Sequence, residues 1–447
     1  MLAGVSRAGP SYPLLPQNVL RASPRRHMAK AAARPEGKLR KSGFRAVERD
    51  ERGAIIPKKK EQSLGAFRAL PPANLTHPAF KSNDRAVLNL PVFTPSRHLL
   101  GQAAEFNLTD NDPVRMFGLP KKMLLEFRLL SKPCSVVRDI TVHTAELLGK
   151  AGDKSSLETR LVLNGQQGCG KSYLMLQTVE HCVSSGWIVI YIPRAVKLVN
   201  STTSYEYDLR TRTYLQPKFA FQTLQRLQTV NKYALSGLTT SKKLVFEKRE
   251  IPLGTNLADL VGAALKDPPL APLILDALMT ELSIQTKHPV LLAVDDFQAL
   301  YCRTAYRDPH FIPIRSYHLA IPRMIMEFAS GKRSFAKGAF LGALTTSDTN
   351  YKTPLELRDA LGLPEEHAAS PYHKRSQALA EYTHGLQALN VPDQMSVAEA
   401  ASLFEVWMKD RALVPSSYDE LFLSKYTESS GNPRDFVWKG LLATLEP

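Results

Sequence analysis

Short apolar segments recur along the chain, and polar or turn-forming residues bound each of them. Four are continuous runs of strand length, at residues 161–163, 187–192, 289–294 and 338–344, and a weaker one lies at 386–391. Apolar runs without alternation indicate strands that are buried on both faces, as in a parallel sheet. Helical patterns separate these runs, so we expect an α/β fold with a parallel sheet flanked by helices.

Helix-like segments occupy much of the remaining chain. The pattern predicts helices at residues 121–130, 136–148, 219–235, 256–286, 396–407, 418–430 and 434–445, and one after the strand at 161–163. Ser396 and Glu399 have the spacing of a capping box, which marks the start of the helix at 396–407. A glycine–asparagine–proline turn at 431–433 separates the last two helices, so we predict a helical cap at the C-terminal end.

A glycine-rich turn follows the first strand and opens a helix. Its residues match the P-loop pattern G-x-x-x-x-G-K-[ST]. The glycines allow backbone N–H groups to face a phosphate, and the helix N-terminus adds its positive dipole end. A lysine in this pattern meets the β- and γ-phosphates, and the following hydroxyl meets Mg²⁺. The candidate nucleotide-binding residues are Gly165, Gln166, Gln167, Gly168, Cys169, Gly170, Lys171, Ser172 and Tyr173.

Two carboxylates end the apolar run at 289–294. We expect Asp295 to hold Mg²⁺ together with Ser172, and Asp296 to act as the catalytic residue that polarises the attacking water. The run at 338–344 ends in two threonines, of which Thr345 is the candidate to contact the γ-phosphate, with Thr346 as the alternative. The carboxyl ends of parallel strands lie at one edge of a sheet. The P-loop turn and the residues that follow the runs at 289–294 and 338–344 are therefore expected to form a single nucleotide site.

The small switch GTPases are a poor match. No D-x-x-G begins at the carboxylates that end the acidic strand, and no N-K-x-D occurs in the sequence. The pattern favours the AAA-like or signalling-ATPase type of P-loop NTPase, which inserts a strand between the P-loop strand and the acidic strand. In that type the turn before the last helix faces the nucleotide. Arg434 could reach a phosphate there, although we favour a surface charge.

Positive charge is concentrated at the N-terminal end. The chain has 447 residues and a formal net charge of +16, and residues 1–60 hold 15 Lys and Arg against 4 Asp and Glu. Residues 1–35 contain no acid and are rich in Ser, Ala and Arg, which is typical of a mitochondrial transit peptide and predicts location in the matrix. A basic tail that contacts nucleic acid is the alternative.

These features divide the chain into four parts. We expect a transit peptide at 1–35, a basic, proline-rich extended arm at 36–120, a P-loop nucleotide-binding domain at 121–391 and the helical cap at 392–447. Residues 194–214 mix basic and aromatic side chains; a solvated loop is favoured over an RNA contact. Four cysteines without metal-ligand spacing predict reduced thiols, and no apolar run is long enough to span a membrane.

The combined features resemble the mS29, or death-associated protein three, family of the mitochondrial small ribosomal subunit, in a fungal form. The features that carry the resemblance are the basic presequence, the proline-rich lead-in and residues 161–172, 188–201, 205–207, 291–297 and 430–434. The resemblance implies a guanine nucleotide, GTP or GDP, with Mg²⁺; ATP is the alternative. It also implies contacts with small-subunit rRNA, with neighbouring small-subunit proteins and towards the large subunit.

Two hypotheses from different classes follow. The first is a structural ribosomal component in which the nucleotide acts as a bound cofactor. The second is an AAA-like or signalling ATPase whose helical cap moves during turnover. We favour the first, because Asp296 is shorter than the Glu of vigorous ATPases and the sequence contains no recognisable arginine finger. At most we expect a slow GTPase.

Overall fold

The computed structural model describes residues 88–107, 112–246, 249–364, 374–410 and 418–444. All of these residues belong to one compact unit, Ser63–Pro447. The predicted transit peptide and the first part of the predicted arm lie outside the described residues. None of the helices in the described ranges has the length and hydropathy needed to cross a membrane.

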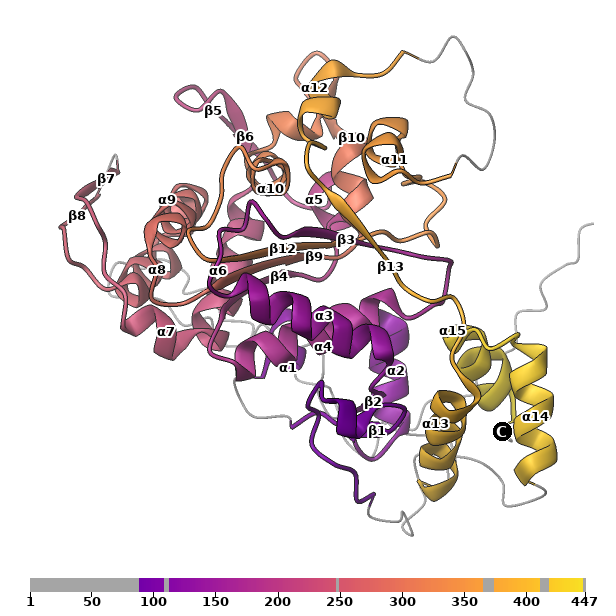
Figure 1. The fold of residues 1–447 in the computed structure, drawn as a ribbon. Helices are drawn as coiled ribbons and strands as arrows, with labels where there is room; N and C mark the ends of the chain where they lie inside the picture. The colour runs from indigo at the N-terminus through magenta and orange to yellow at the C-terminus, as the bar shows by residue number, and fades with distance from the viewer. Residues whose placement is uncertain (1–87, 108–111, 247–248, 365–373, 411–417, 445–447) are drawn as a thin grey trace, which may run out of the picture. The chain divides into compact units, whose positions relative to one another are not determined.

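A five-stranded parallel sheet forms the centre of the described unit (Figure 1). Its strand order is β13 (Gln387–Asn390), β3 (Arg160–Asn164), β12 (Gly338–Ala343), β9 (Val290–Val294) and β4 (Ile188–Ile192). These are the five predicted strands. The P-loop strand β3 and the acidic strand β9 are separated by β12, as expected for the class in which a strand is inserted between them.

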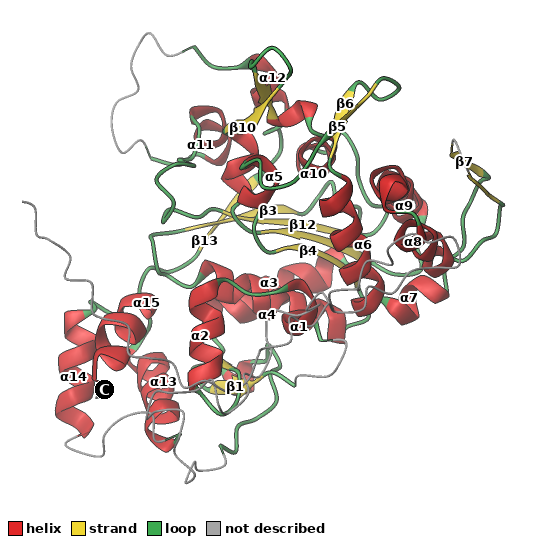
Figure 2. Cartoon of the chain, turned by 180° about the vertical axis from the view of Figure 1, so that it is seen from behind, coloured by secondary structure: helices red, strands yellow, loops and turns green. Residues whose placement is uncertain are grey.

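Helices cover both faces of this sheet (Figures 1 and 2). One face packs on α3 (Asp139–Ala151) and α4 (Lys171–Ser184), with Leu161, Leu163, Val189 and Leu291 pointing towards them. The opposite face is covered by α5 (Val196–Val199), α6 (Pro217–Val230), α9 (Ala271–Ile284) and α10 (Ala320–Ser330), and α8 (Leu257–Lys266) packs on α6 and α9. Because neighbouring residues of each strand enter opposite cores, both faces require apolar side chains, which explains the continuous apolar runs.

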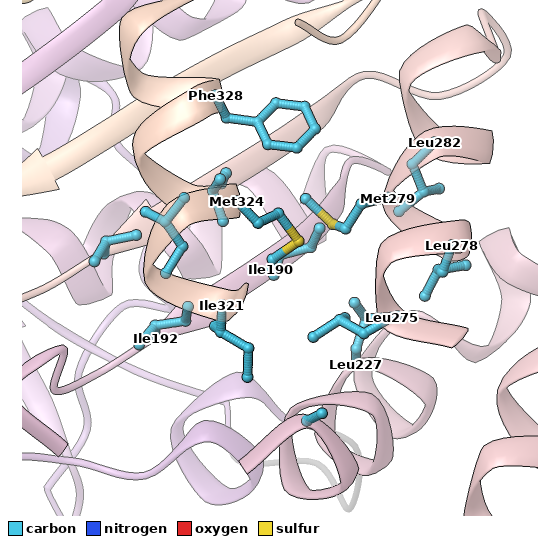
Figure 3. Close-up of a cluster of buried hydrophobic side chains, with 14 of the residues drawn as sticks. Ile190, Ile192, Leu227, Leu275, Leu278, Met279, Leu282, Ile321, Met324 and Phe328 are labelled. Atoms are coloured by element: carbon cyan, nitrogen blue, oxygen red, sulfur yellow. The ribbon is translucent and has the colours of Figure 1, made fainter. Parts of the chain in front are cut away.

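The larger of the two cores fills the space between the sheet and the helices α6, α9 and α10. Figure 3 shows Ile190 and Ile192 of β4 facing Met279 of α9 and Met324 of α10. Each of these side chains is at most 7% exposed. This packing holds the carboxyl ends of β4 and β9 in fixed positions, and the candidate site lies at those ends.

The C-terminal helices share a separate core with the segment that precedes β3. This core joins α13 (Val397–Lys409), α14 (Tyr418–Glu428) and the π-helical turn Phe436–Leu441 to α2 (Lys121–Leu129), β1 (Ala103–Glu105) and β2 (Cys134–Val136). Trp407, Phe436 and Leu129 are among its buried members. Residues from the predicted arm therefore take part in folding the C-terminal helices, and the domain boundaries at 120 and 391 stay predictions.

The remaining elements are short. They comprise the helices α1 (Pro113–Phe117), α7 (Lys232–Ser236), α11 (Leu355–Leu361), α12 (Gln377–Glu381) and α15 (Pro433–Asp435), the 3₁₀ turns Arg97–Leu99, Pro268–Leu270, Phe297–Tyr301, Ser316–His318 and Leu442–Thr444, and three antiparallel hairpins. The hairpins are β5 (Glu206–Asp208) with β6 (Thr213–Leu215), β7 (Leu244–Phe246) with β8 (Arg249–Ile251), and β10 (Arg303–Arg307) with β11 (Pro313–Arg315).

Two of the predicted helices are interrupted in the structure. The segment 256–286 divides into α8, a 3₁₀ turn and α9, because Asp267 precedes Pro268 and adopts φ −130° and ψ 86°. The segment 219–235 divides at Asn231, whose side chain accepts a hydrogen bond from Val189 N–H at 2.8 Å and donates one to Val189 O at 2.9 Å. The Asn231 amide thus binds the outer edge of β4, where no further strand of this sheet lies within the described residues.

Other predicted boundaries shift as well. The helix predicted at 136–148 begins at Asp139, because residues 134–136 pair with β1. The closing helix predicted at 434–445 is a short α-helical turn followed by the π-helical turn Phe436–Leu441. Residues 194–214, predicted as a solvated loop, contain α5, β5 and the first two residues of β6. The capping box of α13 is present as predicted, with Glu399 N–H donating to Ser396 Oγ at 3.2 Å.

Candidate nucleotide site

The glycine-rich turn connects β3 to α4, as the sequence predicts. β3 ends at Asn164, and α4 begins at Lys171 with Gly170 as its N-cap in a left-handed conformation. The first N–H groups of a helix have no partner within the helix, so they are free to bind an anion. The turn therefore directs backbone donors and a helix dipole towards one point.

Two glycines in this turn have no room for a side chain. Gly168 has φ +89°, and a Cβ there would lie 2.4 Å from Asn432 Oδ1. Gly165 has φ +154°, and a Cβ would lie 2.8 Å from Val391 O. Val391 directly follows β13 and Asn432 directly precedes α15, so the glycines are needed for close approach of the loop to the C-terminal region.

Lys171 is held inside the loop, where its side chain binds the carbonyls that precede it. The ammonium donates to Gly165 O at 2.7 Å and to Gln166 O at 2.8 Å, and Lys171 is only 8% exposed. The positive charge thus lies at the centre of the loop, where the P-loop pattern requires it.

The acidic strand places its two carboxylates beside the P-loop helix. Ser172 Oγ donates to Asp295 Oδ2 at 2.8 Å, and Asp296 N–H donates to Asp295 Oδ1 at 2.9 Å. Thr345 Oγ1 lies 3.5 Å from the same Oδ1, so the structure brings Thr345 rather than Thr346 to the carboxylate. Residues from β9, β12 and α4 converge as the order of the sheet predicts.

Burial and the neighbouring Asp296 charge raise the pKa of Asp295 to about 7, whereas the hydrogen bonds from Ser172 and Asp296 N–H, and the Lys171 charge, lower it. A hydroxyl and a carboxylate at this separation are the oxygen ligands that Mg²⁺ takes when phosphates complete its coordination. The residues therefore fit Mg²⁺. The described residues contain no group of three or more His, Cys, Asp or Glu that could hold a metal by themselves.

Asp296, the candidate catalytic residue, has an ionic partner that sequence reasoning missed. Arg194 Nε lies 3.5 Å from Asp296 Oδ2. Asp296 has φ 58° and ψ 34°, a left-handed conformation that is uncommon outside Gly, Asn and Asp. Arg194 follows β4, which lies beside β9 in the sheet. Its position directly after a predicted strand is the sequence feature that could have placed it near Asp296.

A second missed residue, Arg138, connects the P-loop to the segment after β13. Its guanidinium donates to Cys169 O at 2.8 Å, Pro392 O at 3.1 Å and Gln394 O at 2.7 Å, and its Nε lies 3.3 Å from Glu399 Oε2. Arg138 precedes α3, and a lone arginine at a helix start carries no pattern that sequence reasoning recognises.

The C-terminal turn also binds the P-loop backbone. Asn432 Nδ2 donates to Gln167 O at 3.0 Å, and Arg434 N–H donates to Gly168 O at 3.1 Å. Asp393 Oδ1 accepts from Gln166 N–H at 2.7 Å. Arg434 also lines the cavity beside the P-loop, and its Nε lies 3.8 Å from Asp435 Oδ1. These contacts fix the C-terminal helices to the loop.

A cavity of about 410 Å³ extends from the P-loop to an apolar end. Its polar end contains Lys171, Ser172, Asp295, Asp296 and Thr345. Its apolar end lies between α2, β2 and the C-terminal helices and is lined by Met123, Phe127, Leu130, Val136, Leu403, Trp407 and Trp438. A charged end joined to an apolar end suits a ligand with phosphates and a heterocyclic base.

The chain resembles known proteins over most of its length. Residues 135–438 match the family described as mitochondrial ribosomal death-associated protein 3. Proteins named small ribosomal subunit protein mS29 are 27% identical over 68% of this chain in Neurospora crassa and 26% identical over 72% in Schizosaccharomyces pombe. The alignments span 66% and 67%, about two thirds, of the length of those relatives.

Among solved structures, the ADP form of the Aeropyrum pernix ORC2 protein aligns with 69% of this chain and 62% of its own, at 14% identity. Its TM-score of 0.35 is too low to carry a comparison of folds. The family match, in contrast, covers the sheet, the P-loop and most of the C-terminal helices. The chain therefore belongs to the mitochondrial ribosomal death-associated protein 3 family.

Proposed function

We propose that this chain is a structural component of the mitochondrial small ribosomal subunit that holds a purine nucleotide with Mg²⁺. The names of its relatives support the ribosomal and mitochondrial parts of the proposal. The Ser172–Asp295 hydrogen bond at the polar end of the cavity is the observation that carries the nucleotide part. We assign the fold to the AAA-like or signalling-ATPase type of P-loop NTPase, with the C-terminal helices as its cap.

The phosphates would lie at the loop formed by residues 165–172, against Lys171 and the start of α4. Ser172 and Asp295 would hold the metal, whose charge offsets that of the phosphates. The base would enter the apolar end of the cavity. Guanine is expected from the family, as GTP or GDP, and ATP is the alternative.

The nucleotide would link the P-loop to the C-terminal helices. Arg138, Asn432 and Asp393 already join the loop to the C-terminal region. A ligand between the loop and the C-terminal helices adds contacts to both, so it would stabilise the folded unit by mass action. A bound ligand that stabilises the fold suits a structural component of a large assembly.

Contacts with rRNA are proposed for the basic arm that follows the proposed transit peptide, in which residues 36–60 hold nine Lys and Arg. Lysine and arginine displace cations that are condensed on the phosphates of a nucleic acid. The release of these cations favours binding of a basic segment. Neighbouring small-subunit proteins and the large subunit are the other proposed partners, and residues 1–35 are proposed to direct the chain to the mitochondrial matrix.

Slow turnover is expected of the wild-type protein. Asp296, the candidate catalytic residue, is short and is engaged by Arg194, and the contacts of Asn432 and Arg434 hold the cap against the P-loop. Release of product then requires the cap to open, which is a gated step. We expect GDP or GTP to copurify and steady-state hydrolysis to stay below about one per minute, well under the usual range of enzyme turnover.

The contacts between the cap and the P-loop are also what a moving ATPase would use, so the second hypothesis has a structural basis. Nucleotide analysis of the purified chain, beside a hydrolysis assay with GTP and ATP, separates the two. Turnover of many per second, with no retained nucleotide, would favour the ATPase.

Asp295→Asn is expected to weaken nucleotide binding in the presence of Mg²⁺ by roughly 10-fold or more and to change Mg²⁺-free binding little. The substitution keeps the side-chain shape but removes the charge that Mg²⁺ prefers in its ligands. Titrations with magnesium and with a chelator measure both affinities, with Asp276→Asn on the surface of α9 as the matched control. A wild-type protein with equal affinities under both conditions would contradict the metal role.

A further inference from the structure

The apolar end of the cavity contains a buried carboxyl group, on Glu126 of α2. Glu126 is 9% exposed and lines the cavity beside Met123 and Phe127. The other acidic residues in the lining, Asp295, Asp296 and Asp348, follow strands β9 and β12 at the polar end. A carboxylate among apolar side chains is costly unless it is hydrogen-bonded, so its presence here requires an explanation.

Two donors from distant parts of the chain position this carboxylate. The Tyr173 hydroxyl donates to Oε2, and the Trp438 indole N–H donates to Oε1. Each carboxylate oxygen has two lone pairs, so each keeps one for a further donor. Lys122 Nζ lies 4.9 Å from the centre of the Trp438 ring, which places a positive charge nearby.

Tyr173 connects Glu126 to the phosphate end. It follows Ser172 in the first turn of α4, so its backbone lies beside the loop, whereas its hydroxyl reaches Glu126. A base that is joined through a ribose to phosphates at this loop would extend from the loop towards Glu126, as the Tyr173 side chain does. Trp438 is only partly buried, lines the cavity at this end and offers aromatic surface to a flat ring.

We propose that Glu126 reads the base of the bound nucleotide and selects guanine over adenine. This inference rests on the proposed function. Guanine presents two parallel donors, N1–H and the exocyclic amine, and the two free acceptor sites of a carboxylate match them. At the same edge of the ring, the N1 atom of adenine is an acceptor, and its lone pair would face the carboxylate. Glu126 thereby supplies the base selection for which the sequence has no N-K-x-D motif.

The test measures the affinity of the full chain, freed of nucleotide, for GDP, inosine diphosphate, ADP and inorganic pyrophosphate. Sites that hydrogen-bond a substrate group reject analogues lacking it strongly, so GDP should bind at least about 100-fold more tightly than ADP. Inosine diphosphate keeps N1–H and lacks the amine, and it should fall between them. This comparison requires no substitution.

Glu126→Gln keeps the shape of the side chain and replaces one acceptor by a donor. It should reduce the preference for GDP over ADP to less than about 10-fold, because an amide suits the adenine edge and opposes the guanine donors. Binding of pyrophosphate, which has no base, should not change. Glu405→Gln on the exposed side of α13 is the matched control and should keep the wild-type ratio.

Each outcome decides between base recognition and a structural role. Equal wild-type affinities for GDP and ADP, or an unchanged ratio in Glu126→Gln, would overturn the inference while nucleotide binding itself stands. Loss of pyrophosphate binding in Glu126→Gln, with a lower melting temperature, would show that Glu126 only supports the fold and would also overturn it. Failure of the wild-type chain to bind pyrophosphate or any of the nucleotides would instead contradict the proposed function.

Discussion

Replacing Lys171 with alanine is expected to lower the affinity for GDP with Mg²⁺ by at least about 100-fold. The ammonium lies inside the loop and binds Gly165 O and Gln166 O, so it is already near the expected phosphate position. Hydrogen bonds to charged groups contribute about 1.5–3 kcal/mol each, and about 1.4 kcal/mol corresponds to tenfold in affinity. Two such bonds to phosphate oxygens account for the expected loss.

Fluorescence or calorimetric titration of the full chain measures this loss, with Lys150→Ala on the exposed end of α3 as the control. The variant should also lose stabilisation by ligand, which is about 2.7 kcal/mol when free nucleotide is at 100 times its Kd. Melting temperatures of wild type and variant should therefore differ with GDP and converge without it. Unchanged affinity in Lys171→Ala would refute the phosphate site.

Arg138→Ala is expected to lower the free energy of unfolding by about 3 kcal/mol, since the substitution leaves the buried Cys169 O and the largely buried Glu399 carboxylate without this partner, at about 1–3 kcal/mol each. The guanidinium serves Cys169 O, Pro392 O and Gln394 O and pairs with Glu399, and its side chain is 12% exposed. Water can reach part of this set once the side chain is removed, so the full sum is not expected.

Thermal and urea unfolding of the nucleotide-free chain measure the change. Arg97→Ala is the matched control, because Arg97 also pairs with a glutamate, Glu146, but its side chain is 80% exposed. Exposed ion pairs contribute little, so this control should unfold like the wild type. An Arg138→Ala protein as stable as the Arg97→Ala protein would show that the bridge between the P-loop and residues 392–399 is energetically unimportant.

The sequence predicted the parts of the fold that depend on local pattern. Continuous apolar runs located four strands of the main sheet, a weaker run located β13, and the P-loop spacing located the strand, turn and helix around Lys171. The sequence also predicted that one strand lies between the P-loop strand and the acidic strand, and β12 occupies that place, but the sequence did not predict the positions of β4 and β13. Asp295, Ser172 and Thr345 meet because parallel strands end at one edge.

The contacts that sequence reasoning missed join residues that are far apart in the chain. Arg138 binds carbonyls 254 and 256 positions away, and Asn432 binds one 265 positions away. Their partners are backbone oxygens, which every residue carries, so no side-chain pattern marks them. The division of the predicted helix at 219–235 has the same origin, because Asn231 docks on β4 through backbone groups.

The strand order β13-β3-β12-β9-β4 has a consequence for the order in which the chain folds. β3 ends at residue 164, but its two neighbours are β12 at 338–343 and β13 at 387–390. A chain that emerges from a ribosome or an import channel with its N-terminus first exposes this apolar strand long before either neighbour arrives. Non-local pairing of this kind is slow and leaves unpaired strand edges exposed to aggregation. Chaperone binding during synthesis and import would therefore have to cover the P-loop strand until nearly the whole chain is present, and a nucleotide site cannot form before then.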